Sequence, residues 1–363
     1  MFASLLSFLE QKATPTSRLA FLRCLRWFLF VHARLKEVLN KAKLWVLRVS
    51  IVLLASVSPF ISSGCREDKQ LTKITLLTDW FPQPEHGGFY NALVKGYYED
   101  VGLKVEIIPG GLYAFTIDRV AHGEAEFGMG GSEDMLLAVE QGAPVVAIGA
   151  TMQRSPLGIM VHAESPVLSF EDLEGKSIAA TPGIGWYNYI SRKYGLKNLN
   201  ITQLSSTMDD FFENPDSIQQ VFVTSETFFA EKRGIPTRVL LVSDSGYNPY
   251  RVVFGSKTFI QAHPDITRSF MLASIRGWRD YLKNPRAAHR EIKNRNPKKT
   301  DEFLEYSWKK LREYHFVTGD PGKEERIGTI DPDRWRQQYQ ILRDLDIVKH
   351  DFDPMRALST SFF

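Results

Sequence analysis

Residues 73–90 read KITLLTDWFPQPEHGGFY, and the order of residue types in this stretch decides the fold. The apolar run at 74–77 has the length of a buried strand and ends at Asp79 and Trp80. A pair of glycines then begins an amphipathic stretch with Phe89 on its apolar face, which predicts a helix. A strand followed at once by a helix is the first part of a βαβ unit, in which helices cover parallel strands.

The same alternation continues through the body of the chain. It predicts strands at 105–108, 127–129 and 145–148, with helices from about Tyr113 and at 132–140 between them. A second set of strands is predicted at 177–180, 201–204, 220–223 and 239–242, with helices at 183–194 and 225–233. The apolar runs 157–161 and 251–254 bracket this set, and helical stripes follow at 266–282 and 332–345.

The predicted fold class is therefore α/β, with two doubly wound lobes joined by two crossover strands. Each lobe is expected to contain a parallel sheet with helices on both faces. Lobe I comprises residues 66–158 and 256–363, and lobe II comprises residues 159–255, inserted into lobe I. Residues 1–65 precede the lobes as an N-terminal extension and signal segment.

The charge of the chain is unevenly distributed. Nine of the 45 Lys and Arg residues but only two of the 42 Asp and Glu residues lie in 1–65, so the overall charge of +3 becomes −4 for the rest. A protein that binds nucleic acid carries its basic excess on the folded domain. We therefore expect no nucleic-acid partner.

The positive charge belongs to an export signal. Lys41, Lys43 and Arg48 precede an apolar run at 49–61, and small residues lead from there to Cys65. The run contains a proline and is shorter than the roughly 20 residues that cross a membrane. The ending Ser-Gly-Cys resembles a bacterial lipoprotein box, which implies lipidation at Cys65 and a protein held at the membrane in the periplasm or cell envelope.

Two questions about this region stay open in the sequence. Cys65 is alternatively a cysteine that ends an ordinary signal. Residues 1–43 are longer than a normal cationic region, and they are either a cytoplasmic extension or the result of a misplaced start codon. The second cysteine is Cys24, so the body of the chain holds no cysteine for a disulfide or a zinc site.

Ligands of doubly wound sheets bind beyond the carboxyl ends of the strands. The side chains that follow the predicted strands are aromatic, acidic or hydroxyl-bearing. We predict that these residues bind the ligand: Asp79, Trp80, His86, Tyr90, Ser132, Glu133, Asp134, Thr181, Trp186, Tyr187, Thr224, Glu226, Tyr247 and Tyr250.

The chemistry of this set favours a neutral or weakly basic heterocycle that carries amino groups. Aromatic rings stack on planar ligands, and carboxylates accept hydrogen bonds from amino groups. Basic residues are scarce at these points, the nearest being Arg154 and Arg251, whereas a phosphate or sulfonate would need more positive charge. We predict no cofactor, no metal and no catalytic residue.

Ten of these candidates also have a structural interpretation. Trp80 and Trp186 are alternatively core aromatics, and Ser132 and Thr224 are alternatively N-caps. The acids Glu133, Asp134 and Glu226 would then be favourable first-turn residues, His86 a structural histidine, and Tyr247 and Tyr250 packing residues of the crossover.

These stretches resemble the NMT1/THI5-like (SsuA/THI5-like) branch of type II periplasmic binding proteins. The resemblance lies in Leu77–Pro82, His86–Tyr90, Lys95–Tyr98, the Leu-Glu-Gly-Lys entry at 173–176, and Val223–Glu226. It implies a binding protein that delivers a small molecule to the permease of an ABC importer. We expect the protein to be a monomer. The ligands that it implies are thiamine-pyrimidine precursors, riboflavin-like flavins or aliphatic sulfonates.

The same branch contains an enzyme, which is the rival interpretation. That enzyme builds the thiamine pyrimidine from its own histidine and pyridoxal phosphate, with iron. At the positions of its lysine and its donor histidine this chain has Gly130 and Asp134, and its cysteine-rich motif is missing. Without an amine nucleophile and an imidazole at these positions, the synthase chemistry has no reagents. We therefore expect hinge closure of the lobes on a ligand, with no covalent step.

Overall fold

The computed structural model describes residues 70–111, 114–181, 185–205, 207–319 and 327–362, together with Arg34 and Lys36. The chain divides into two compact units, residues 1–69 and 70–363. The predicted signal segment and Cys65 lie outside the described residues. Within the described part of the chain, no helix combines the length and apolar character needed to cross a membrane. The fold of the second unit follows.

The first sheet has five strands in the order β2-β1-β3-β10-β4. Its strands are β1 (Thr72–Leu77), β2 (Leu103–Ile108), β3 (Phe127–Gly131), β4 (Val145–Met152) and β10 (Arg251–Ser256). β1 pairs in parallel with β2 and β3, whereas β10 runs antiparallel between β3 and β4. The strand that completes this sheet therefore comes from about 100 residues further along the chain than β4.

The second sheet has the order β7-β6-β8-β5-β9. Its strands are β5 (Leu157–His162), β6 (Ser177–Ala180), β7 (Asn200–Gln203), β8 (Gln219–Phe222) and β9 (Thr237–Leu241). β6 is parallel to β7 and β8, and β5 lies antiparallel between β8 and β9. Two mixed sheets thus replace the all-parallel sheets that the alternation predicts. β5 and β10 are the strands that enter from the other sheet, and each runs against its neighbours.

Strand pairing assigns β5 entirely to the second sheet and β10 entirely to the first. Pairing alone would therefore divide the lobes before Leu157 and before Arg251. The lobe limits 66–158, 159–255 and 256–363 remain a proposal.

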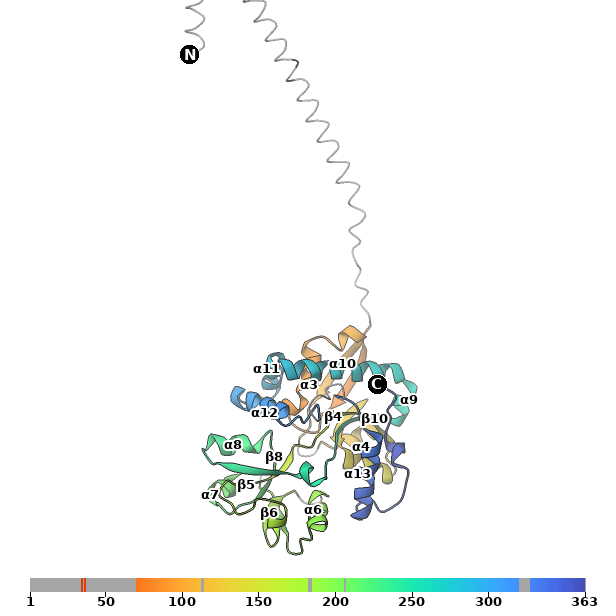
Figure 1. Cartoon of the computed structure of the whole chain (residues 1–363). Helices are drawn as coiled ribbons and strands as arrows, with labels where there is room; N and C mark the ends of the chain where they lie inside the picture. Colours follow the sequence, from red (N-terminus) through yellow and green to blue (C-terminus); the bar gives the residue numbers. More distant parts are fainter. Residues whose placement is uncertain are drawn as a thin grey trace, which may run out of the picture. The chain divides into compact units, whose positions relative to one another are not determined.

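Helices cover both sheets (Figure 1). They are α3 (Gly87–Val94), α4 (Thr116–Ala121), α5 (Ser132–Glu140), α6 (Trp186–Tyr194), α7 (Asp209–Glu213), α8 (Glu226–Lys232), α9 (Lys257–Ala262), α10 (Pro264–Lys283), α11 (Arg286–Arg295), α12 (Asp301–Glu313) and α13 (Pro332–Asp344). In Figure 1, α3, α10, α11 and α12 lie together beside the first sheet, and α6, α7 and α8 lie with the second. One apolar cluster surrounds the first sheet and another the second, while a third runs from the first sheet to Val223, Phe228 and Leu241 of the second lobe.

The Gly87-Gly88 pair has a packing role. A Cβ atom on Gly87 would lie 2.2 Å from the Tyr281 ring, and one on Gly88 would lie 2.1 Å from the Trp278 ring. Both rings belong to α10. The two glycines therefore allow α3 and α10 to approach closely, and this contact holds the preceding loop, residues 79–86, against the body of the first lobe.

Residues 153–156 and 242–250 connect the two sheets, and α13 binds both connections. Arg334 Nη1 donates to the carbonyl of Gln153 at 2.6 Å, and its Nη2 donates to the carbonyl of Asn248 at 2.7 Å. The connections also bind each other, because Ser155 N donates to Asn248 Oδ1 at 2.8 Å. The two connections and α13 thus form one hydrogen-bonded unit.

Candidate functional site

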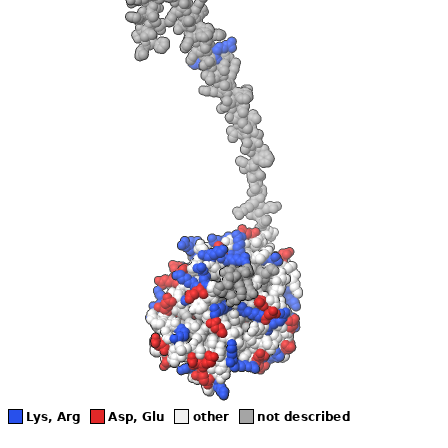
Figure 2. Space-filling model, in the orientation of Figure 1, with Lys and Arg blue, Asp and Glu red and all other residues white. Residues whose placement is uncertain are grey.

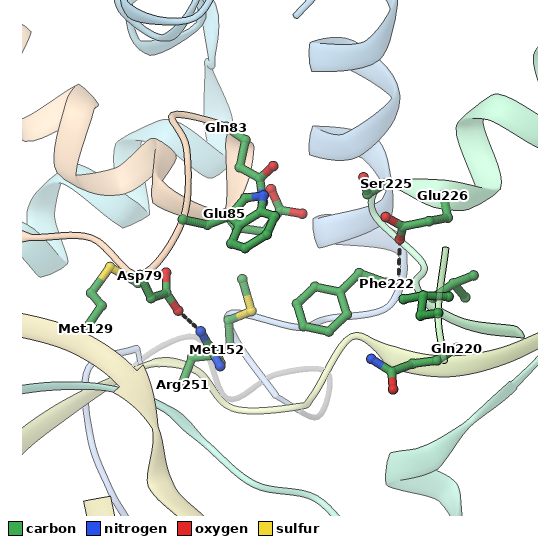
Figure 3. Close-up of a pocket in the computed structure, with 13 residues that line it drawn as sticks. Asp79, Gln83, Glu85, Met129, Met152, Gln220, Phe222, Ser225, Glu226 and Arg251 are labelled. Atoms are coloured by element: carbon green, nitrogen blue, oxygen red, sulfur yellow. Dashed lines mark hydrogen bonds and ion pairs between the residues drawn. The ribbon is translucent and has the colours of Figure 1, made fainter. Parts of the chain in front are cut away.

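A cavity of about 270 Å³ lies between the two sheets. Figure 3 shows its walls. The first-sheet side contributes Asp79, Trp80, Gln83, Glu85, Met129, Met152 and Arg251. The second-sheet side contributes Leu204, Gln220, Val221, Phe222, Ser225 and Glu226. Because both sheets line the cavity, a molecule bound in it would contact both lobes at once.

Asp79 follows β1 and binds two cationic or polar partners. Its Oδ2 forms an ion pair with Arg251 at the start of β10, and its Oδ1 lies 3.0 Å from His86 Nε2. Burial lowers the pKa of Arg251 to about 10, so the guanidinium keeps its charge at neutral pH. One carboxylate therefore neutralises the one arginine in the cavity wall and also fixes the histidine behind it.

His86 is a neutral, buried support for Asp79. Its side chain is about 1% exposed, and burial lowers its pKa to about 4. His86 Nδ1 has no hydrogen-bond partner among the described residues, so a proton there would be buried without an acceptor. The tautomer that fits has its proton on Nε2, donated to Asp79.

A hydrogen bond joins the two walls of the cavity. Thr224 Oγ1, in the turn after β8, donates to Glu85 Oε1 in the short 3₁₀ helix Pro84–His86. Both residues are buried, and burial raises the pKa of Glu85. The other carboxyl oxygen, Glu85 Oε2, has no partner among the described residues although Glu85 lines the cavity. A ligand with an N–H group would satisfy this oxygen.

Glu226 is the first residue of α8 and faces the cavity from the second lobe. Its Oε2 accepts the backbone N–H of Phe222 at 2.7 Å, which fixes the carboxyl group at the end of β8 (Figure 3). Burial raises the pKa of Glu226 as well. Both cavity glutamates thus hold their protons at a higher pH than an exposed glutamate does.

Gln220 is a hydrogen-bonding side chain whose orientation is fixed from behind. Its Oε1 lies 3.3 Å from Trp186 Nε1 and 3.3 Å from Thr181 N, and both are donors. The amide nitrogen therefore points away from these donors, toward the cavity. The cavity thus combines an acceptor at Glu85 with a donor at Gln220, a pattern that suits a heterocycle with N–H groups and ring nitrogens or carbonyls.

Of the residues predicted to bind the ligand, Asp79, Trp80 and Glu226 line the cavity. His86 and Thr224 do not line the cavity but bind the lining residues Asp79 and Glu85. Thr181 and Trp186 likewise donate to the lining residue Gln220. Trp186 itself is fully buried in the core of the second lobe, with Tyr187 packed edge to face against it.

The remaining predicted residues lie elsewhere. Tyr90 is buried in the first core near Arg295. Ser132 and Tyr250 bind each other, since Tyr250 N donates to Ser132 Oγ at 2.9 Å, and the Arg334 guanidinium lies 3.7 Å from the Tyr250 ring centre. Ser132 and Thr224 do not act as N-caps, because Gly131 and Ser225 hold those positions.

Glu133 and Tyr247 meet at a second buried polar position. Glu133 Oε2 and Tyr247 Oη have no hydrogen-bond partner among the described residues, and burial together with the negative charge of Asp134 raises the pKa of Glu133 to about 8. Asp134 also has a raised pKa, because of burial. None of these three residues lines the cavity between the sheets.

Several cavity residues were not among the predicted ones. Gln83, Glu85 and Ser225 lie within the loops that the sequence singles out. Their place in the chain could be predicted from the sequence, but the direction of their side chains could not. Arg251 and Gln220 lie at or inside strands. The apolar lining residues have no chemical signature in the sequence: Met129, Met152, Leu204, Val221 and Phe222. Within the described ranges, no three His, Cys, Asp or Glu side chains come together as a metal site.

Comparisons with known proteins agree with this architecture. The riboflavin-binding protein RibY of Chloroflexus aurantiacus is 24% identical over 322 residues, which cover 85% of this chain and 90% of RibY. The formylaminopyrimidine-binding protein of Halalkalibacterium halodurans is 24% identical over 254 residues, 67% of this chain and 76% of that protein. The 4-amino-5-hydroxymethyl-2-methylpyrimidine phosphate synthase of Schizosaccharomyces pombe is 22% identical over 304 residues, 78% of this chain and 84% of the synthase.

Solved structures show the same fold. The periplasmic aliphatic sulphonate binding protein SsuA of Escherichia coli superposes with a TM-score of 0.62 at 14% identity, over 79% of this chain and 97% of SsuA. The fold is therefore that of the periplasmic binding proteins. The family described as NMT1/THI5 like matches residues 83–288, which is more than half of the sequence, and the chain belongs to that family.

Proposed function

We propose that this protein is the extracytoplasmic solute-binding component of an ABC importer. It closes its two lobes on a small heteroaromatic nutrient, of which a thiamine-pyrimidine precursor is the leading example. One observation carries this proposal: the cavity is walled by both sheets and crossed by the Thr224–Glu85 hydrogen bond. A ligand that contacts both walls stabilises the closed arrangement by its differential affinity for it.

The charges of the cavity support an uncharged or weakly basic ligand. Arg251 is already paired with Asp79, so an anion would have to compete with a carboxylate that also binds His86. Glu85 and Glu226 add two more acidic groups to the walls. An aliphatic sulfonate is therefore the poorest match of the ligand classes known in the family. A heterocycle that donates to Glu85 and accepts from Gln220 satisfies both walls.

The relatives are consistent with this ligand class. Two of them are named for binding riboflavin and formylaminopyrimidine, both of which are nitrogen heterocycles. We extend the proposal to the parts of a binding-protein system: an export signal within 1–65, a lipid anchor at Cys65, a monomer in the periplasm or cell envelope, and a permease that recognises the closed lobes.

On the described face, acidic and basic side chains are interspersed (Figure 2).

The synthase relative makes an enzyme the second candidate. Its printed name describes the formation of a pyrimidine phosphate, and it aligns with 78% of this chain. Against this, the positions that the resemblance assigns to the lysine and the histidine of such enzymes are Gly130 in β3 and Asp134 in α5. Neither residue can form a Schiff base or donate imidazole atoms. We therefore propose that this chain is not an enzyme.

A ligand screen tests the proposal. The secreted domain, residues 66–363, is mixed with pyrimidines, flavins, polyamines and sulfonates, and its melting temperature is measured. A ligand present at 100 times its Kd stabilises the folded state by about 2.7 kcal/mol, so specific binding is readily seen. Stabilisation by a pyrimidine or flavin supports the proposal. Stabilisation by sulfonates alone would contradict the ligand class, and a pyridoxal phosphate Schiff-base absorbance would favour the enzyme.

A further inference from the structure

Helix α8 of the second lobe packs against helix α12 of the first. The ring centre of Phe228 lies 5.4 Å from that of Phe303, edge to face at an interplanar angle of 87°, and also 5.4 Å from that of Tyr306. Phe228 and Phe303 are both buried, and they belong to the apolar cluster that runs from the first sheet into the second lobe. The two lobes therefore meet at an apolar contact that is separate from the connections between the sheets.

Two polar contacts accompany these rings. Tyr306 Oη donates to Thr227 Oγ1 at 2.9 Å, and the Thr227 hydroxyl donates in turn to the carbonyl of Val223 at 2.6 Å. At the surface, Lys232 forms an ion pair with Glu302 at 2.5 Å. We call the whole contact the α8–α12 latch, and its residues are Thr227, Phe228, Lys232, Glu302, Phe303 and Tyr306.

The latch is distinct from the surface that would bind a ligand. All six latch residues lie in described parts of the chain, and none of them lines the cavity between the sheets. By contrast, the Thr224–Glu85 bond ends at a residue that does line the cavity. Contacts that a ligand does not touch favour the closed arrangement equally in the empty and the loaded protein.

The latch and the connections between the sheets lie on different sides of the second unit. In Figure 1, α8 and α12 are on the left, whereas α13, whose Arg334 binds both connections, is on the right. Rotation of the lobes about these connections would therefore separate α8 from α12. The latch is thus placed where it opposes opening most effectively.

We propose that the α8–α12 latch holds the two lobes together with or without a ligand, so that the protein is closed most of the time and opens only briefly. This inference uses the two-lobe motion of the proposed function and adds a closing force that is separate from ligand binding. The ring contacts and the buried hydrogen bond each raise the ratio of closed to open protein several-fold. The exposed ion pair contributes less, because water and salt screen it.

A substitution on α12 weakens the latch. Tyr306→Ala removes the ring contact with Phe228 and the hydrogen bond to Thr227, whose hydroxyl keeps its bond within its own segment. We expect the ratio of closed to open protein to fall about 30-fold. Tyr314→Ala is the matched control. Tyr314 is also half-buried against the same cluster, at the end of α12, but its ring stacks on Phe316.

A pair of spin labels measures the opening without any ligand. The secreted domain, residues 66–363, contains the compact unit and no cysteine. Glu213→Cys on α7 and Arg290→Cys on α11 give one exposed attachment point on each lobe, outside the latch and the cavity. Pulsed electron paramagnetic resonance then gives the distribution of label distances. We expect one dominant short distance for the wild type and for Tyr314→Ala, and an added longer distance for Tyr306→Ala.

An exchange of charges tests the surface part of the latch without disturbing the core. Glu302→Lys places a like charge opposite Lys232, and we expect it to lower the ratio of closed to open protein about two- to fivefold. Adding Lys232→Glu restores the pair in reverse order and should return the distances to those of the wild type. Both side chains are exposed, so circular dichroism and the melting temperature should change little.

The outcomes separate the latch from the proposed function. A dominant long distance in the ligand-free wild type overturns the latch, as do identical distance distributions for the wild type and Tyr306→Ala. If Tyr306→Ala does not fold, an unchanged distribution in Glu302→Lys, or no rescue by the charge exchange, overturns it. Each of these results leaves the solute-binding function standing, because no ligand is present. A failed ligand screen would overturn the function and leave the latch standing.

Discussion

Thr224 and Glu85 form a hydrogen bond between the two walls of the cavity, although 139 residues separate them in the sequence. Glu85 lines the cavity and uses one oxygen for this bond, while its other oxygen is buried without a hydrogen-bond partner among the described residues. The same carboxyl group can therefore bind the opposite lobe and the ligand together. We therefore predict that closure and binding are coupled at this residue, since each interaction would position the group for the other.

Replacement of the hydroxyl tests this coupling. Thr224→Val keeps the shape of the side chain but leaves Glu85 Oε1 without its donor, and we expect ligand affinity to fall about 5- to 30-fold, from a loss of about 1–2 kcal/mol. Calorimetry measures the affinity. Thr267→Val is the control, because Thr267 is also fully buried but its hydroxyl bonds within its own segment, to His263 O. Equal losses of affinity in both variants would rule out a special role for the cross-wall bond.

Glu226 is expected to contribute to ligand binding directly. Glu226→Ala should weaken binding at least tenfold, since it removes a polar wall of the cavity and also the acceptor for Phe222 N. Glu226→Gln keeps an acceptor for that N–H and should preserve the melting temperature. If Glu226→Gln binds the ligand as tightly as the wild type does, the carboxyl group of Glu226 is not required for ligand binding.

The Asp79–Arg251 pair should behave as a coupled unit. Asp79→Ala leaves the guanidinium of Arg251 in the cavity wall without its ion-pair partner, and we expect a loss of about 3 kcal/mol of stability. Arg251→Met alone leaves Asp79 with His86, and the double variant should be more stable than Asp79→Ala alone. Denaturant unfolding of the four proteins gives the coupling free energy, and additive effects would show that the pair is not coupled.

Acid should destabilise the protein through His86. The pKa of this histidine falls from 6.5 to about 4 on burial, so the unfolded chain binds a proton between these pH values and the folded protein does not. The contribution of His86 to stability is therefore complete above about pH 6.5 and is lost as the pH falls toward 4, by up to about 3 kcal/mol.

The measurement is the melting temperature between pH 4 and 7 for the wild type and His86→Gln. The variant should have a flatter profile, because glutamine does not titrate while it can still donate to Asp79. His289 also has a pKa lowered to about 4 by burial, so His289→Gln serves as the comparison that subtracts its share. A profile for His86→Gln as steep as that of the wild type would contradict the assignment.

The sequence predicted the strands well, because strand formation depends on short apolar runs that are visible locally. All ten predicted strand runs overlap the observed β1 to β10. Helices α11 and α12 were not predicted, since their charged faces obscure the apolar stripe that packs on the first lobe. Strand direction was the larger error, because it depends on where the chain re-enters a sheet.

That error also explains the site residues. β10 runs antiparallel to β3 and pairs Arg251 with Gly131, so Tyr250 and Arg251 arrive at the carboxyl end of β3. There the backbone N–H of Tyr250 donates a hydrogen bond to the Ser132 hydroxyl, and Arg251 forms an ion pair with Asp79. In a sheet of parallel strands alone, Ser132 would stay open to a ligand. Arg251 would not reach the cavity wall. The loop after β1 needs no such long-range pairing, and its residues Asp79 and Trp80 line the cavity. That they bind the ligand stays a prediction.

The place of β10 in the middle of the first sheet fixes the order in which the protein can be assembled. β3 and β4 are synthesised early, but neither has its shared neighbour until residue 256 has been made. Until then their inner edges expose unpaired backbone groups over apolar strands, the kind of surface on which chains aggregate. A nascent chain that ends within the second sheet therefore contains no complete domain. The first sheet can be completed only after β10 has been synthesised.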